Sequence, residues 1–185
     1  MANIISITFF EGGELNIAGT ETTPVQERVA KLISKYEPLF LQKALGYPLW
    51  KLLKDNGYPT PPAGRFKDLI DGNVEYVDRN GNTQNWIGLK DTYQSPIAAY
   101  VWYYYQRHIA TNTTVTGESK GKTENAGNVD VMTKQMRAWN EMSRIVSCEL
   151  WEYLLYAKNG SNERIYPEFK LSDAKYFGVL NTANL

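Results

Sequence analysis

The stretch "SPIAAYVWYYYQRHIA", residues 95–110, decides the fold of this 185-residue chain. Ser95 and Pro96 are typical of a helix start, because serine caps free N–H groups and proline fits the first helical turn. The apolar residues that follow do not keep to one stripe but surround the helix on all sides. Such a helix is enclosed by protein, so we predict that it is the central helix of the fold or lies between subunits.

The region before this helix carries its own helical signals. Thr23 is the expected N-cap, Pro24 the first helical residue, and Gln26 closes a capping box with Thr23. The segment "EPLFLQKAL", residues 37–45, predicts a second helix, and Gly46 is suited to end it. Two shorter helices are predicted from "YPLWKLL" and from "RFKDLID".

A β-hairpin is predicted at about residues 74–87, in "VEYVDRNGNTQNWIGL". Asn80 and Gly81 suit the two positive-φ positions of a two-residue turn, and β-prone residues flank them. That turn places Val74 opposite Ile87 in the register. We expect the hairpin to protrude from the helices.

The remaining chain divides into a polar segment, a long helix and a tail. Residues 111–128 are polar and rich in Thr and Gly, which predicts a long exposed loop. Apolar residues at alternating steps of three and four predict a helix from Val129 to Lys158. Residues 161–185 show no period.

The predicted fold is therefore mainly α, a bundle of about five helices with one protruding hairpin and extended terminal arms. Residues 1–20 form an N-terminal arm, in which two short strands around a Gly-Gly turn make a hairpin. Residues 21–160 form the helical domain, and residues 161–185 form a C-terminal arm that lies on other surfaces.

Charge and cysteine content narrow the function classes. Twenty basic and twenty acidic residues cancel, so the strongly basic footprint of a nucleic-acid-binding domain is missing. A single cysteine excludes an internal disulfide framework. We find no basic leader and no apolar run of about 18 residues, so we expect a protein without a membrane partner that is made in the cytoplasm.

The heptad "GESKGKT", residues 117–123, looks like a phosphate-binding loop but departs from it. That loop has four residues between its glycines, whereas three separate Gly117 from Gly121. The flanking sequences also lack the buried strand and the helix start that position such a loop. We interpret the heptad as part of the exposed polar loop.

Other catalytic patterns are equally sparse. Cys148 falls on the apolar face of the long helix, where a buried thiol is ordinary packing, and His108 is the only histidine. One His and one Cys do not build a structural zinc site. Asp68 and Asp71 look like surface charges on a short helix. We therefore expect no enzyme, no cofactor and no metal.

Large aromatic rings are unusually frequent, with 13 Tyr, 6 Phe and 5 Trp. Such rings supply contact area at low entropy cost and are common in cores and at interfaces, so both interpretations stay open. Because the arms, the hairpin and the polar loop are typical of a part that assembles, we take six rings as candidate assembly surfaces: Trp86, Trp102, Tyr103, Tyr105, Tyr166 and Phe169.

The order of these segments resembles that of small head–tail connector proteins (head-completion or neck proteins) of tailed phages and prophages, particularly those of Bacteroidetes hosts. The resemblance covers about residues 24–157 and rests on "EPLFLQKALGYPLWKLLKD", "RFKDLIDG", "WIGL", "SPIAAYVWYYYQRH", "GESKGKTENAGN" and "MRAWNEM". It implies a mostly helical subunit of a homo-oligomeric ring under the portal protein. The ring extends the DNA channel and offers a docking surface to a tail or stopper protein.

The resemblance has further implications for position and partners. Lys120 and Lys122 would face the channel and make non-specific DNA contact, and the protein would lie in the virion neck after synthesis in the host bacterial cytoplasm. The alternative that the residues leave open is a carbohydrate- or protein-binding module that uses exposed aromatic rings.

Overall fold

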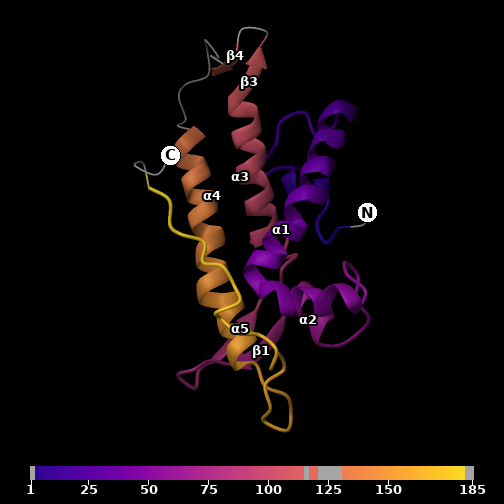
Figure 1. The fold of residues 1–185 in the computed structure, drawn as a ribbon, viewed down its shortest axis with the longest axis vertical. Coiled ribbons are helices and arrows are strands. Elements are labelled where there is room, and N and C mark those ends of the chain that lie inside the picture. The colour runs from indigo at the N-terminus through magenta and orange to yellow at the C-terminus, as the bar shows by residue number, and fades with distance from the viewer. Residues whose placement is uncertain (1–2, 115–116, 121–130, 182–185) are drawn as a thin grey trace.

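The computed structural model describes residues 3–114, 117–120 and 131–181 (Figure 1). The predicted mainly helical architecture with an antiparallel hairpin is confirmed. Helix α3, Pro96–Ala110, lies between α1, Thr23–Asp55, and α4, Val131–Ile145, as Figure 1 shows. Its position confirms the prediction of a central helix.

The start of α3 follows the sequence prediction closely. The Ser95 hydroxyl accepts the N–H of Ala98 at 3.2 Å and donates to the carbonyl of Leu89 at 2.7 Å. It thereby satisfies one free donor of the first turn and ties the helix to the preceding loop. From Ile97 to Tyr103 every residue is buried, because α3 has protein on all of its sides.

Helix α1 corrects the prediction of separate helices before and after residue 36. It continues through Pro38, whose missing N–H would have bonded the carbonyl of Ser34. Ser34 is exposed, so solvent can take the place of that hydrogen bond. The predicted stop at Gly46 appears as a kink at φ 73°, where an added Cβ would lie 2.8 Å from the side chain of Asp173. Glycine is required there both for the backbone angle and for the close approach.

The beginning of α1 also differs from the prediction. Thr22 rather than Thr23 is the N-cap, and neither side chain forms a capping bond. The Gln26 side chain instead donates to the carbonyl of Thr20 at 3.0 Å. The predicted capping box is therefore wrong, because Gln26 finds its partner in the segment that leads into the helix.

The last helical run confirms the predicted long helix, with one irregularity. Helix α4 continues through a π-helical turn, Val146–Leu150, into α5, Trp151–Tyr156. The wide turn holds Val146 and Leu150 in the core and leaves Cys148 exposed. The expectation of a buried Cys148 is therefore wrong.

The predicted hairpin exists, but its register differs by one residue. Strand β1, Val74–Val77, pairs with β2, Thr83–Trp86, so that Val74 faces Trp86 rather than Ile87. The loop has five residues instead of two, because the Asp78 carboxylate accepts the N–H groups of Asn80 and Asn82 at 2.8 and 2.9 Å. This register buries the Trp86 ring, which stacks on Tyr153 with centroids 5.5 Å apart.

A close contact fixes the hairpin to the short helix α2, Arg65–Asp71. Gly72 ends α2 at φ 73°, and a Cβ there would lie 2.0 Å from the carbonyl oxygen of Ile87. The Trp86 indole N–H donates to the carbonyl of Leu69 at 3.0 Å. These two contacts hold β2 against the end of α2.

The polar segment after α3 is not simply a loop. Strand β3, Thr111–Thr114, pairs with β4, Gly117–Lys120, in antiparallel register. Thr residues are β-prone, so the first half of the segment forms a pair of short antiparallel strands directly after α3. The rest of the predicted loop, residues 121–128, lies outside the described residues.

The two predicted arms fold onto the helices. The N-terminal segment contains no strand within residues 3–22 and buries Ile5, Phe10 and Ile17. The C-terminal segment runs back along the helical body, as the yellow trace in Figure 1 shows, and buries Tyr166, Phe169 and Phe177. The predicted N-terminal hairpin is therefore wrong. The C-terminal arm lies on other surfaces as predicted, and those surfaces belong to its own chain, since apolar residues without a period can still fill spaces between helices.

Candidate interaction surface

The six aromatic rings predicted as assembly surfaces are buried within the single chain. None is more than 6% exposed, and this holds for Trp86, Trp102, Tyr103, Tyr105, Tyr166 and Phe169. Their polar atoms also have partners in the same chain: the Trp102 indole donates to the Asn16 carbonyl, and the Tyr166 hydroxyl donates to the Arg65 carbonyl. The chain itself covers these rings, so none of the six offers a surface to another molecule.

The two predicted lysines are not placed in a common site. Lys120 is the last residue of β4 and faces Thr111 in the register, and Lys122 lies outside the described residues. A strand at Gly117–Lys120 also differs from the turn that a phosphate-binding loop requires.

Residues with catalytic or metal-binding chemistry are dispersed in the described part of the chain. His108 Nε2 lies 3.0 Å from the Tyr36 hydroxyl, and Cys148 Sγ lies 3.6 Å from Ser147 Oγ. Asp71 forms ion pairs with Lys67 and Lys90, which keep the pKa of its carboxyl low even though partial burial opposes them. Among residues 3–114, 117–120 and 131–181, no three His, Cys, Asp or Glu side chains gather as metal ligands.

One groove of about 370 Å³ has the character of a binding surface. Its floor is formed by small and apolar side chains, Ala99 of α3 and Ala138 and Ile145 of α4. Its first wall is the N-terminal loop 8–15, and its second wall is the turn 92–95 before α3. Three segments distant in the sequence therefore enclose a space that no described side chain fills.

The second wall carries the most exposed large ring among the described residues, Tyr93, at 91% exposure. Its backbone is held in place, because the Asp91 carboxylate accepts the N–H groups of Tyr93 and Gln94 at 2.9 and 2.8 Å. The capped start of α3 at Ser95 anchors the other end of the turn. A ring on a fixed turn loses little freedom on binding, so it is suited to anchor a partner.

The rim of the groove is acidic. Glu11, Glu14 and Glu141 line it, and no Lys, Arg or His does so in the described part of the chain. Glu141 is paired with Arg144 at 2.8 Å, which lowers the pKa of its carboxyl. Glu11 and Glu14 form no ion pair with a described residue. Their charges are therefore open to a basic partner.

A buried carboxylate holds the first wall to the helical body. Glu37 of α1 is fully buried and accepts the N–H groups of Ile4 and Ile5 at 2.8 and 3.0 Å. The Tyr58 hydroxyl donates to the same carboxylate. Burial raises the pKa of Glu37, against the lowering effect of these bonds. The clamp fixes the segment from which residues 8–15 leave to form the wall.

Sequence reasoning missed this groove entirely. Local signals for its parts were present, such as the Gly12-Gly13 pair and the Asp91 that precedes Tyr93. Neither signal indicates that the two segments face each other across Ala99 and Ala138. Only the packing of α3 against α4 brings them together.

Comparison with known proteins supplies no family. No protein-family model matches the chain, and no curated protein or solved structure is significantly similar to it. In the described ranges, none of the helices combines the length and apolar character needed to cross a membrane.

Proposed function

We propose that this protein is a structural subunit of a phage neck. Copies of it form a ring that binds the portal protein, extends the DNA channel and receives a tail or stopper protein. The observation that carries the proposal is the acid-rimmed groove beside Tyr93, a surface suited to another protein. The segment order over about residues 24–157, which resembles that of head–tail connector proteins, supplies the phage context.

The shape of the groove favours a protein partner over a small substrate. Its floor is apolar, and an exposed tyrosine stands at its edge. Tyrosine is enriched among residues that dominate binding energy, especially next to apolar pockets. The carboxylates on the rim would orient a partner that carries basic groups.

The acidic rim also restricts where DNA can lie in such a ring. Glu11, Glu14 and Glu141 would repel backbone phosphates, so the groove side would face neighbouring subunits instead of the channel. Non-specific DNA contact through Lys120 and Lys122 stays a prediction.

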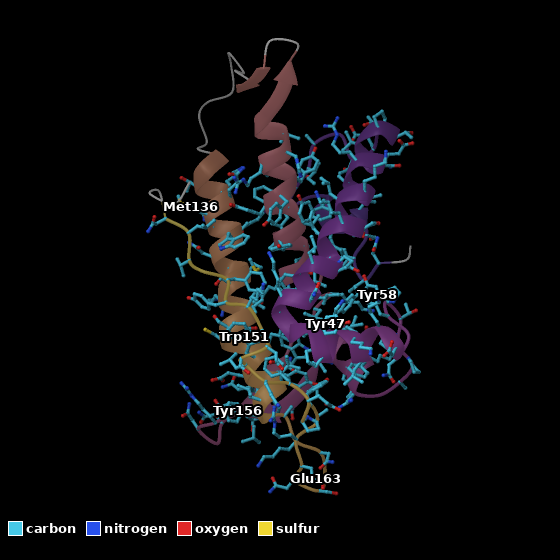
Figure 2. All side chains as sticks on the ribbon, in the orientation of Figure 1. Tyr47, Tyr58, Met136, Trp151, Tyr156 and Glu163 are labelled. Carbon is cyan, nitrogen blue, oxygen red and sulfur yellow. The ribbon has the colours of Figure 1, made fainter. Side chains whose placement is uncertain are left out.

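A second candidate function is a protein-binding module outside a virion, which the same groove favours. The carbohydrate-binding version has less support, because a sugar platform needs exposed rings side by side. Tyr93 is the one exposed large ring in the groove lining among the described residues, and Tyr47 of α1, labelled in Figure 2, lies outside that lining.

Co-expression with the portal protein of the same genome tests the proposal. We expect the two proteins to co-elute in gel filtration and electron microscopy to show this chain as a ring on the portal. A portal that elutes without this chain at every concentration would count against the proposal. A gene neighbourhood without portal, capsid or tail genes would favour the binding module.

A further inference from the structure

The charges of this chain cancel in number but are separated in space. The formal net charge is zero, yet the groove lining holds three carboxylates and no described basic residue. A neutral chain with an acidic patch must carry a matching basic excess elsewhere. The position of that excess indicates what the groove would attract.

The basic excess includes an exposed face on α1 and the C-terminal segment, which we call the lysine face: Lys31, Lys35, Leu39, Lys175 and Tyr176. Lys31, Lys35 and Leu39 follow one another at steps of four, so they lie along one side of α1, where Glu27, one turn before Lys31, is the acidic neighbour. Leu39 is 41% exposed and Tyr176 68% exposed. The Lys175 N–H donates to the carbonyl of Lys43 at 2.8 Å, which places Tyr176 beside the turn of α1 that follows Leu39.

The groove and the C-terminal end of the lysine face, Lys175 and Tyr176, lie on different flanks of α4. On α4, Ala138, Glu141 and Ile145 turn toward the groove, whereas Trp139 and Ser143 turn toward the C-terminal segment. At 3.6 residues per turn these two sets lie on opposite flanks of the helix. Figure 1 shows the C-terminal segment passing along α4, with α1 on the other side of α3.

We propose that the groove of one copy receives the lysine face of the next copy. This inference rests on the proposed function, and it names the contact that would join neighbouring subunits. Exposed Leu39 and Tyr176 supply apolar groups for the floor at Ala99 and Ala138, and the lysines meet Glu11 and Glu14. Because the groove and the lysine face are two different surfaces of the chain, the contact is head-to-tail, the type that generates rings or filaments.

The test uses charge reversal on the full chain. The groove variant carries Glu11→Lys and Glu14→Lys, and the face variant carries Lys31→Glu and Lys35→Glu. A control variant, Glu75→Lys with Glu163→Lys, makes the same change in net charge as the groove variant, but on β1 and on the 159–163 turn. Sedimentation and native mass spectrometry at low salt follow assembly up to about 1 mM, which detects weak contacts. Circular dichroism melting confirms that each variant folds.

We expect the wild type and the control to form species larger than a dimer that weaken as salt screens the charges. Each charge-reversed variant alone should associate at least tenfold more weakly, and an equimolar mixture of the two should restore assembly. A wild type that stays monomeric or stops at a dimer would overturn the inference, as would variants that assemble like the control. The proposed function is judged separately, since portal binding without an effect of these substitutions would leave it standing.

Discussion

The two flanks of helix α4 differ in how well the chain covers them. On the tail side, Phe177 fills the seam between α1, α3 and α4, with its ring 5.6 Å from Phe40 and 5.9 Å from Tyr100. On the groove side, Ala99 and Ala138 leave a space of about 370 Å³ between two loops. The side with large rings is closed by the chain, and the side with small residues stays open.

The closed side is also tied by polar contacts. The Trp139 indole donates to the Gly178 carbonyl at 2.7 Å, and Asn140 exchanges two hydrogen bonds with the backbone of Leu180. The Arg65 guanidinium forms a two-bond contact with the Glu168 carboxylate at 2.9 and 3.0 Å. Most of the large rings are therefore used inside the chain. The interface candidate is the groove, where Tyr93 is the exposed ring among the described residues.

The largest expected effect comes from opening the closed side. Phe177→Ala should lower the free energy of unfolding by about 3–5 kcal/mol, because it removes a ring that three aromatic side chains enclose. Urea unfolding measures this. Val179→Ala, two residues away and 60% exposed, is the control and should change stability by less than about 0.5 kcal/mol. Equal effects would mean that the tail does not seal the seam.

A smaller effect is expected at the clamp that holds the groove wall. Glu37→Gln should cost about 1–3 kcal/mol, because an amide cannot accept from both Ile4 and Ile5 while its own NH₂ group faces a donor. Urea unfolding at a fixed pH gives this difference. A neutral result would show that the two backbone donors do not depend on the carboxylate.

The difference in the free energy of unfolding between wild type and Glu37→Gln should depend on pH. Burial raises the pKa of Glu37 above its ordinary value of 4.5, so the folded state favours the protonated acid. The stability from this group is complete below pH 4.5 and is lost as the pH rises through the folded pKa. The advantage of wild type over Glu37→Gln should therefore shrink as the pH rises. Carboxylates with lowered pKa, such as Glu168, contribute equally to both proteins.

The smallest effect on folding is expected on the open side. Tyr93→Ala should change the free energy of unfolding by less than about 0.5 kcal/mol, since the ring is 91% exposed. Association through the groove should nevertheless weaken about tenfold or more, if Tyr93 is the anchor. Thermal melting and sedimentation on the same samples separate the two quantities. Loss of stability without loss of association would reverse the roles assigned to the two sides.

Local sequence signals predicted where the helices lie better than they predicted which segments pack against each other. The central helix could be predicted because apolar residues surround it. The break at Gly46, which is a kink in α1, could be predicted because glycine suits its backbone angle. The hairpin register was not readable, since the Asp78 side chain competes with the expected two-residue turn. Packing of the tail was invisible because Tyr166 and Phe177 follow no period.

The groove could not be predicted for a related reason. It joins residues 8–15, the turn at 92–95 and one flank of α4, and no local pattern links segments so far apart in the chain. The exposure of Tyr93 likewise depends on which other rings the fold buries. Residue counts gave the abundance of rings but not their location.

Hydrogen exchange measured on the free and the assembled protein tests the central claim most directly. Assembly should slow exchange at the groove walls, residues 8–15 and 91–95, and along Lys31–Leu39 of α1. Exchange in residues 161–170, which pack within the chain, should stay unchanged. Protection that appears only in that tail segment, or faster exchange there because the tail is released to a neighbour, would contradict a closed core with a separate interaction surface.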